Sequence, residues 1–297
     1  MNSFKHVIVI GYGVVSGRVL SYVNDCYNKY GYDITYIEHE IHLFNNTKKY
    51  AKTNGINCMV IEDGISLTKY LEKSARCEKV LIISASNNFL FPKRIVDNKN
   101  IRIINFHNAL LPDLPGRNAP SWAIYEKYLK TGITWHYVDS GIDEGDIIIQ
   151  KECSLNDDTR AYELVAIQMR LAGDAFEEIF EDVLNDAVKS KKQIIPEKRR
   201  IYRSKEVPGG GAFSIEDDAD DIYRLLRSMD YGKNSIFPPP KTVYNEQMIE
   251  IKRYKKIDVS ENREADDKIF LPLGEDKLLM LKYEITKHGK GQEAERM

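Results

Sequence analysis

Two polar side chains that could move a proton stand at the end of an apolar run in the middle of the chain. Asn105 and His107 are two residues apart in the run I-R-I-I-N-F-H. If this run is a strand, both side chains point to one face of its sheet. An imidazole carries a proton near neutral pH, and an amide N–H can donate to a developing oxyanion. The pair therefore predicts a reactive site, and the alternative is a structural or solvated histidine.

A second polar segment, S-G-I-D-E-G-D, follows an alternating strand pattern at residues 133–138. Three acids and two glycines in so short a loop can bring a carboxylate back against an imidazole. An acid beside His107 would favour the charged form of its ring and fix its orientation. A solvated acidic turn before an edge strand explains the same pattern equally well.

The first glycine-rich turn offers a competing site. Gly11, Gly13 and Gly17 end a strand pattern and open a helical one, and Glu38 ends the next strand pattern. Phosphates bind at such turns, and an acid after the following strand can hold a ribose hydroxyl. The spacing G-x-G-x-x-x-G departs by one residue from the dinucleotide fingerprint. We therefore favour a structural turn and keep an NAD-dependent dehydrogenase as the alternative from another enzyme class.

Strand and helix patterns alternate through the first part of the chain and would position these residues. Strands are predicted at residues 6–10, 33–37, 58–61, 79–84 and 101–106, with helices between them. Continuous apolar strands between helices are typical of a parallel sheet covered on both faces. Right-handed crossovers make it doubly wound, so the predicted fold is α/β with a Rossmann-like sheet. Ligands bind at the carboxyl ends of such strands, where Asn105 and His107 are expected.

The composition changes after a long amphipathic helix predicted at residues 159–184. The basic segment, residues 189–205, carries eight Lys/Arg residues and a single acid. The run P-G-G-G that follows is typical of a flexible joint. We therefore predict a catalytic domain at 1–206 and a small, mostly-β C-terminal domain at 207–297. The polar end, residues 287–297, is expected to be frayed.

Composition and charge exclude several classes of protein. The 297 residues are 42% hydrophobic and carry a net charge of -2, which argues against a protein devoted to nucleic-acid backbones. The four cysteines lack C-x-x-C spacing, and only His39 and His42 have a metal-like spacing, so no metal is expected. The sequence shows no secretory leader and no run that could span a bilayer. We expect a cytoplasmic protein without a membrane partner.

The segments N-x-H-x-x-L-L-P (105–112) and G-I-T-W-H-Y-V-D-x-G-I-D-E-G-D-I-I-x-Q (132–150) are recognisable together. They resemble the formyltransferases that use 10-formyltetrahydrofolate, and most of all the amino-sugar N-formyltransferases. The resemblance covers roughly residues 80–184, with both motifs in the same order and spacing as in the family. It implies an enzyme of one-carbon transfer.

The catalytic Asn, His and Asp of that family fall here on Asn105, His107 and Asp143, and a supporting histidine falls on His136. The resemblance implies direct attack of a primary amine on 10-formyltetrahydrofolate as co-substrate, without a metal. Asn105 would donate to the oxyanion. His107 would either stabilise the oxyanion as imidazolium or take the amine proton, and Asp143 would hold His107 or order a water. All three groups must then meet at one cleft.

The resemblance also implies where the two substrates bind. The positions that match the folate-binding residues are Phe89, Leu90, Phe91, Val138 and Asp139. The acceptor is expected beside the Pro-rich loop at residues 111–120, which contains Arg117 and Asn118. The Arg117 guanidinium could hold a phosphate, and an exposed loop charge is as good an interpretation.

Three acceptor classes remain: a nucleotide-linked amino sugar, methionyl-tRNA, and an amino acid or peptide-type amine. The basic segment would suit tRNA, whereas residues 207–297 carry 15 Lys/Arg against 18 Asp/Glu. The segment 220–241 resembles the C-terminal region of small-molecule formyltransferases. We therefore predict a nucleotide-linked amino sugar, do not expect nucleic acid as a partner, and allow for a homodimer.

Overall fold

The chain forms two compact units in a computed structural model that describes residues 3–40, 42, 45–233, 235–261 and 265–286. The polar end predicted to be frayed, 287–297, lies outside the described residues. Unit 1 comprises Met1–Pro120, Leu129–Leu155 and Glu163–Ser204. Unit 2 comprises Ser121–Tyr128, Asn156–Tyr162 and Lys205–Met297. The domain division at residue 206 stays a prediction beside this grouping, in which two short earlier segments join the C-terminal part.

Within the described part of unit 1, seven strands form one sheet in the order β3-β2-β1-β4-β5-β6-β7. Its strands are β1 (His6–Gly11), β2 (Asp33–Glu38), β3 (Asn57–Val60), β4 (Val80–Ala85), β5 (Ile101–His107), β6 (Lys130–Tyr137) and β7 (Ile147–Ser154). β1 to β5 pair in parallel, whereas β6 and β7 extend the sheet antiparallel. The predicted doubly wound, Rossmann-like fold is confirmed, with two antiparallel strands added at one edge.

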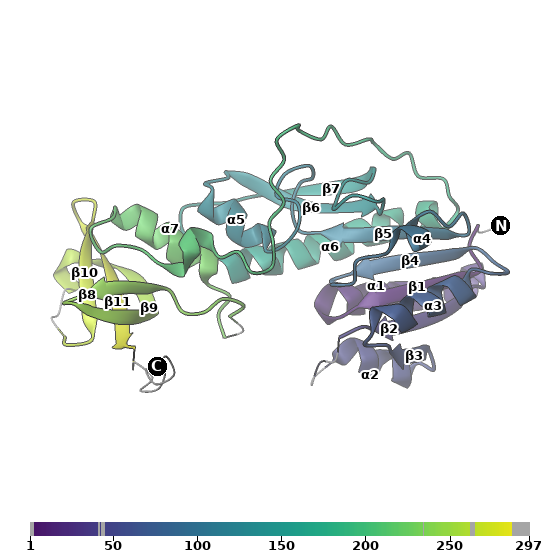
Figure 1. Cartoon of the computed structure of the whole chain (residues 1–297), viewed down its shortest axis with the longest axis horizontal. Helices are drawn as coiled ribbons and strands as arrows, with labels where there is room; N and C mark the ends of the chain where they lie inside the picture. Colours follow the sequence, from purple (N-terminus) through teal and green to yellow (C-terminus); the bar gives the residue numbers. More distant parts are fainter. Residues whose placement is uncertain (1–2, 41, 43–44, 234, 262–264, 287–297) are drawn as a thin grey trace, which may run out of the picture. The chain divides into compact units, whose positions relative to one another are not determined.

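Helices cover both faces of this sheet, because alternate residues of the central strands are apolar on both sides (Figure 1). The helices of the first face are α1 (Gly13–Tyr30), α2 (Asn46–Thr53) and α6 (Ala161–Leu184), and those of the second are α3 (Gly64–Ser74) and α4 (Lys93–Val96). Val7 and Val9 of β1 pack on the first face, and Ile8 and Ile10 pack on the second. The sheet is therefore buried on both sides, and open positions remain mainly at the strand ends.

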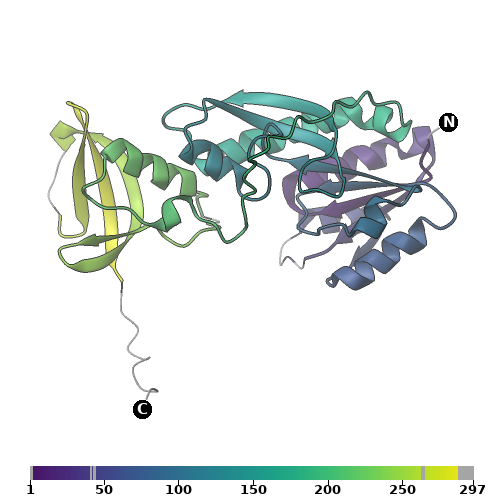
Figure 2. The same ribbon diagram turned by 45° about the horizontal axis from the view of Figure 1, so that its top comes forward.

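Unit 2 is built on an antiparallel sheet whose four described strands lie in the order β10-β11-β9-β8. Its elements are α5 (Ala119–Tyr125), which begins in unit 1, the short 3-10 turns η1 (Pro208–Gly211) and η2 (Val259–Glu261), α7 (Ala219–Met229), β8 (Lys241–Tyr244), β9 (Gln247–Asp258), β10 (Lys268–Leu273) and β11 (Lys277–Ile285). Figure 2 shows α7 alongside this sheet, where Ile222 and Leu226 pack against Leu279 and Leu281. A small, mostly-β region is thus present, and the P-G-G-G run, which we predict to be a flexible joint, forms a 3-10 turn.

The acidic cluster at the start of α7 has a structural role. The Asp218 carboxylate accepts hydrogen bonds from the backbone N–H groups of Asp220 and Asp221, which caps the helix. Asp221 also pairs with Lys127 and Arg224. Among the described residues, no helix is both long and apolar enough to cross a membrane.

Candidate active site

The end of β5 and the facing part of β6 place three of the predicted polar side chains together. In the antiparallel register Asn105 lies opposite His136, and His107 lies opposite Thr134. The Thr134 hydroxyl donates to the Ala109 carbonyl (2.7 Å) and accepts from the Leu111 N–H (3.0 Å). These bonds fix the start of the Pro-rich loop that leaves β5 beside the site.

Asp143 reaches the same place from the loop between β6 and β7. This loop is closed by the Tyr137 N–H, which donates to the Asp146 carbonyl (2.9 Å). Gly145 allows the close turn, because a Cβ there would overlap the Tyr137 carbonyl oxygen. Asp143 itself has a positive φ of 54°, a conformation that Asp tolerates better than most residues. The loop therefore turns its carboxylate back toward β5.

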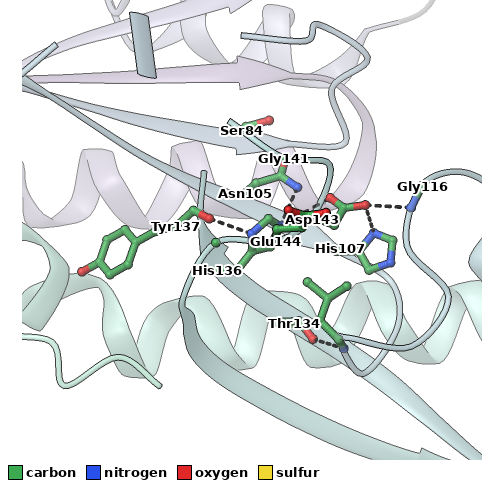
Figure 3. A network of polar contacts seen from close by, with 12 residues as sticks. Ser84, Asn105, His107, Gly116, Thr134, His136, Tyr137, Gly141, Asp143 and Glu144 are labelled. Carbon is green, nitrogen blue, oxygen red and sulfur yellow. Dashed lines mark hydrogen bonds and ion pairs between the residues drawn. The ribbon is translucent and has the colours of Figure 1, made fainter. Parts of the chain in front are cut away.

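The carboxylate of Asp143 lies between two imidazoles (Figure 3). Its Oδ2 is 3.6 Å from Nδ1 of His107, and its Oδ1 is 3.6 Å from Nε2 of His136. The backbone N–H of Gly116 also donates to Oδ2, at 2.7 Å. The amide, the imidazole and the carboxylate predicted from two separate segments are thus brought together.

The hydrogen bonds of the two rings define what each can do. Nε2 of His107 donates to the Leu114 carbonyl (2.9 Å), so Nδ1 of the neutral ring is a free acceptor that faces Asp143. Nδ1 of His136 donates to the Tyr137 carbonyl (2.8 Å). Nε2 of His136 then accepts from the Asn105 amide (3.1 Å), which fixes the orientation of that amide and leaves its second N–H free for a ligand.

Burial and charge set the protonation of the site, since the side chains of His107 and Asp143 are only 5% and 13% exposed. Burial lowers the pKa of His107, and the Asp143 carboxylate offsets only part of this effect. Burial alone would raise the pKa of Asp143, but the two imidazoles and the Gly116 N–H outweigh it and hold that pKa below its ordinary value. Near neutral pH an ionised carboxylate therefore faces a neutral imidazole. Such a pair can accept one proton, next to an amide that can donate to an oxyanion.

The residues predicted to bind folate lie on two loops close to this edge of the sheet. Phe89 and Phe91 contact each other edge to face (5.2 Å between centroids) and, with Val138, pack against one apolar cluster of the core. Leu90 between them is 76% exposed. The Asp139 carboxylate accepts from the Gly141 N–H at 3.0 Å. An exposed aliphatic side chain beside partly buried rings offers apolar surface to a flat heterocycle.

Arg117 and Asn118, predicted to bind the acceptor, follow the glycine that contacts Asp143. The Arg117 side chain is exposed and forms no ion pair with any described residue, while its N–H donates to the Tyr202 carbonyl (2.9 Å). Asn118 has a positive φ of 58°. Arg117, with its exposed side chain, thus follows directly after the residue whose N–H contacts Asp143.

The competing site at the first glycine turn has a structural explanation. Gly11 is required because a Cβ there would overlap the carbonyl oxygen of Ala85 on the neighbouring strand. Glu38 is buried, forms an ion pair with Lys48 (2.9 Å) and accepts the His42 N–H (3.1 Å), so it is not available for a ribose. These contacts favour the structural turn over the dehydrogenase alternative. In the part of the chain that the structure describes, no three His, Cys, Asp or Glu side chains are grouped as a metal site.

Three residues that contact the Asp143 loop are not among those predicted from the sequence. Gly116 acts through its backbone N–H, which leaves no mark in the sequence. Gln193 donates to the carbonyls of Asp143 (3.0 Å) and Gly145 (2.7 Å). Arg199 donates to the Asp143 carbonyl (3.0 Å). Both belong to the basic segment, whose sequence indicates a positive charge but not a contact with this loop.

Comparisons with known proteins find formyltransferases. The formyl transferase family matches residues 53–175. The chain is similar to the methionyl-tRNA formyltransferase of Clostridium novyi, with 26% identity over 222 residues. This match covers 74% of the chain and 68% of the relative, and the match to the Clostridioides difficile methionyl-tRNA formyltransferase covers 62% of that protein.

Solved structures give the fold at lower identity. An N-formyltransferase from Helicobacter canadensis, in complex with folinic acid and dTDP-3-aminofucose, is similar with a TM-score of 0.68 at 14% identity, covering 95% of this chain and all of that one. A 4-N formyltransferase from Francisella tularensis is similar with a TM-score of 0.64 at 18% identity, covering 82% and 94% of the two chains. Residues 53–175 therefore match the formyl transferase family, and the chain has the fold of these N-formyltransferases.

Proposed function

We propose that the chain transfers the formyl group of 10-formyltetrahydrofolate to a primary amine carried by a nucleotide-linked sugar. The observation that carries this proposal is the meeting of three groups at the end of β5. The Asn105 amide, the His107 imidazole and the Asp143 carboxylate form one connected set through contacts of 3.1 to 3.6 Å. Formyl transfer to an amine needs an oxyanion donor and a proton acceptor side by side.

The reaction begins when the neutral amine of the acceptor attacks the formyl carbon and a C–N bond forms. The attacking nitrogen then carries a proton that it must lose. The Asp143 carboxylate and Nδ1 of His107 accept it between them, because Nδ1 has a lone pair and Nε2 is held by the Leu114 carbonyl. The imidazolium formed in this way faces an ionised carboxylate, which stabilises it.

The tetrahedral intermediate places a negative charge on the former formyl oxygen. The free N–H of the Asn105 amide donates to this oxygen, while its other N–H stays bound to Nε2 of His136. His136 is thus a positioning residue for the amide. When the bond from carbon to N10 breaks, the stored proton returns to N10, and the products are the N-formyl acceptor and tetrahydrofolate.

The donor is proposed to bind along Phe89, Leu90, Phe91, Val138 and Asp139. Leu90 offers exposed apolar surface, and the backbone of the two loops offers polar groups. The acceptor is proposed to bind beside Arg117 and Asn118. The free guanidinium of Arg117 suits the diphosphate of a nucleotide-linked sugar.

The choice between a sugar and a tRNA as acceptor rests on the distribution of charge. Methionyl-tRNA formyltransferases are among the relatives in sequence, which keeps tRNA as the second candidate. Residues 207–297 are acidic on balance, which disfavours a phosphate backbone. In the basic segment, Arg199 is paired with Glu144 and Arg200 lies over the Tyr202 ring (4.5 Å), so these two charges already have protein partners. These features support the sugar.

A substrate panel tests the proposal. The purified chain is incubated with 10-formyltetrahydrofolate and, separately, with nucleotide-linked amino sugars, methionyl-tRNA, and free amino acids or peptides. Tetrahydrofolate release and the mass of the product are followed, with the Asp143→Asn variant as control. We expect release with at least one nucleotide-linked amino sugar. Release only with methionyl-tRNA or with amino acids would overturn the acceptor, and stabilisation against heat by NADH but not by the folate would overturn the donor.

A further inference from the structure

The basic segment contacts both loops that meet at Asp143. Lys191 exchanges a pair of backbone hydrogen bonds with Ile147, each 2.8 Å long. Farther along, the N–H of Tyr202 donates to the Pro115 carbonyl (3.0 Å), and its carbonyl accepts from Arg117 (2.9 Å). The segment is therefore tied at one end to the strand that follows the Asp143 loop and at the other to the loop of Gly116.

Arg199 lies between these two attachments and holds the Asp143 loop directly. Its guanidinium donates to the Asp143 carbonyl (3.0 Å) and to the Glu144 carboxylate (2.8 Å). Gln193 donates to the same Asp143 carbonyl and to that of Gly145. Because Asp143 has a positive φ, its peptide needs such external bonds to stay in place. The direction of the Asp143 side chain depends on that peptide.

The burial of Arg199 separates it from an ordinary surface charge. Its side chain is 7% exposed, whereas the other seven Lys/Arg residues of the basic segment, all of them described, are exposed. A buried guanidinium whose two nitrogens bind two different acceptors is oriented more strictly than a flexible surface lysine. Arg199 is thus the cation of this segment whose side chain is buried against the Asp143 loop.

Arg199 also acts on His107 through its charge. Four groups from the surrounding elements act on this ring: the Asp143 carboxylate, the His136 imidazole, the Leu114 carbonyl and the Arg199 guanidinium. Burial is the main cause of the lowered pKa of His107, and the guanidinium adds to it while the carboxylate opposes it. The charge of Arg199 is the smallest of these causes, whereas its hold on the Asp143 loop governs the carboxylate, which is the largest of the charges that act on the ring.

We propose that Arg199 is a positioning residue for formyl transfer, one that aims the Asp143 carboxylate at His107. This inference deepens the proposed function and rests on it. Arg199 itself touches no reacting atom, and Gln193 assists it through the backbone of the same loop.

The test compares Arg199→Gln and Arg199→Lys with Lys198→Gln, which removes a charge from the exposed neighbour. Turnover, KM for 10-formyltetrahydrofolate, the pH dependence of kcat and the unfolding midpoint are measured for each. We expect Arg199→Gln to lower kcat roughly ten- to a hundredfold, with KM little changed. The acid limb of the profile should move to lower pH, because a carboxylate turned away from His107 no longer raises the pKa of the ring. Arg199→Lys should restore the position of the acid limb but only part of kcat, and Lys198→Gln should behave as the parent chain.

A second measurement does not depend on activity. The titration of the His107 imidazole is followed by NMR in the parent chain, in Arg199→Gln and in Lys198→Gln. A downward shift of the His107 pKa in Arg199→Gln alone is the expected result, because a misdirected Asp143 carboxylate no longer raises that pKa. An unchanged pKa, or a loss of kcat that follows the unfolding midpoint with no movement of the acid limb, would overturn the positioning role. Absence of turnover in the parent chain with every acceptor would instead overturn the proposed function.

Discussion

Two places along the carboxyl ends of the parallel strands carry residue patterns typical of binding sites, and their polar side chains are held differently. At the end of β5, Asp143 faces two imidazoles at 3.6 Å, so a proton can be gained or lost by the carboxylate and the rings. At the ends of β1 and β2, Glu38 is closed in an ion pair of 2.9 Å with Lys48. The first region thus places its carboxylate between two imidazoles, whereas the second pairs its carboxylate with an ammonium.

The difference teaches how a structural polar cluster can be told from a reactive one. In the Glu38 cluster, neighbouring side chains bond backbone groups at the ends of helices and strands. Asn45 caps α2, Thr47 donates to the Gly13 carbonyl, and Tyr36 donates to the Gly11 carbonyl. Such bonds stabilise the strand ends. In the Asp143 cluster, by contrast, bonds to backbone carbonyls orient the two imidazoles, and one imidazole orients the Asn105 amide. The remaining polar atoms of these groups are available for a substrate.

Replacement of Asp143 by Asn gives the largest expected effect. The amide keeps the shape of the side chain but cannot take a proton or stabilise an imidazolium, so kcat should fall about 10³-fold. Tetrahydrofolate release with the best acceptor measures the change. Asp146→Asn, in the same loop but with its carboxylate directed to Ser190, should retain near-parent activity. Equal activity of the two variants would remove the proton-transfer role of Asp143.

Gly11→Ala tests the expectation that the first glycine turn supports stability rather than catalysis. Its Cβ would overlap the Ala85 carbonyl, so β1 and β4 must move apart, and the free energy of unfolding should fall by about 3 kcal/mol. Denaturant unfolding measures this loss. Gly17→Ala, in the helical part of the same motif, should change stability by less than about 1 kcal/mol, because its Cβ meets only the Thr47 hydroxyl at 3.2 Å. A loss of folate binding in Gly11→Ala at unchanged stability would mean that the turn belongs to the active site.

The sheet and the Asn105–His107 pair could be predicted because they depend on local patterns. Apolar runs bounded by turns specify strands, and a spacing of two places both side chains on one face. The residue of the acidic loop that meets His107 was identified by family resemblance, since three acids in one turn look alike in sequence. The alternation of apolar and polar residues in β6 predicts a strand but not that it runs antiparallel to β5.

Other contacts of the site were beyond the reach of sequence reasoning. The bond from the Gly116 N–H to Asp143 is made by the backbone, which every residue shares. The bonds of Gln193 and Arg199 join positions 50 and 56 residues from Asp143. Eight basic residues in one segment suggested an anionic partner, and only their burial distinguishes the one that faces inward.

Glu38→Gln should lower stability rather than turnover. The variant removes the charge that pairs with Lys48 and leaves that ammonium without its buried partner, at a cost of about 2 kcal/mol, because Lys48 is 30% exposed and regains some water. Thermal or denaturant unfolding gives the loss, and kcat per folded molecule should stay within twofold of the parent, roughly the error of such assays. A tenfold drop in kcat at unchanged stability would show that the two regions are functionally coupled.

The pH dependence of stability gives the smallest and most specific test of the comparison. The lowered pKa of His107 means that the unfolded chain binds this proton first as the pH falls below 6.5. Unfolding then takes up a proton, so stability decreases with falling pH from 6.5 toward the lowered pKa of the folded state. For Glu38 the pKa is also lowered, because Asn45, Lys48 and the His42 N–H outweigh the effect of burial, but its stabilisation is lost only when the pH falls below about 4.5.

The two regions should therefore lose stability in separate pH windows. Between pH 6.5 and about 5, the unfolding midpoint of the parent chain should fall, and His107→Gln should flatten this slope while Glu38→Gln leaves it unchanged. His6, whose pKa is also lowered by burial, contributes to the same window and sets the residual slope in His107→Gln. Equal slopes in the parent and in His107→Gln would mean that folding does not change the proton affinity of this imidazole. A steeper fall in His107→Gln than in the parent would mean that the folded ring carries a proton through this window and cannot serve as the base.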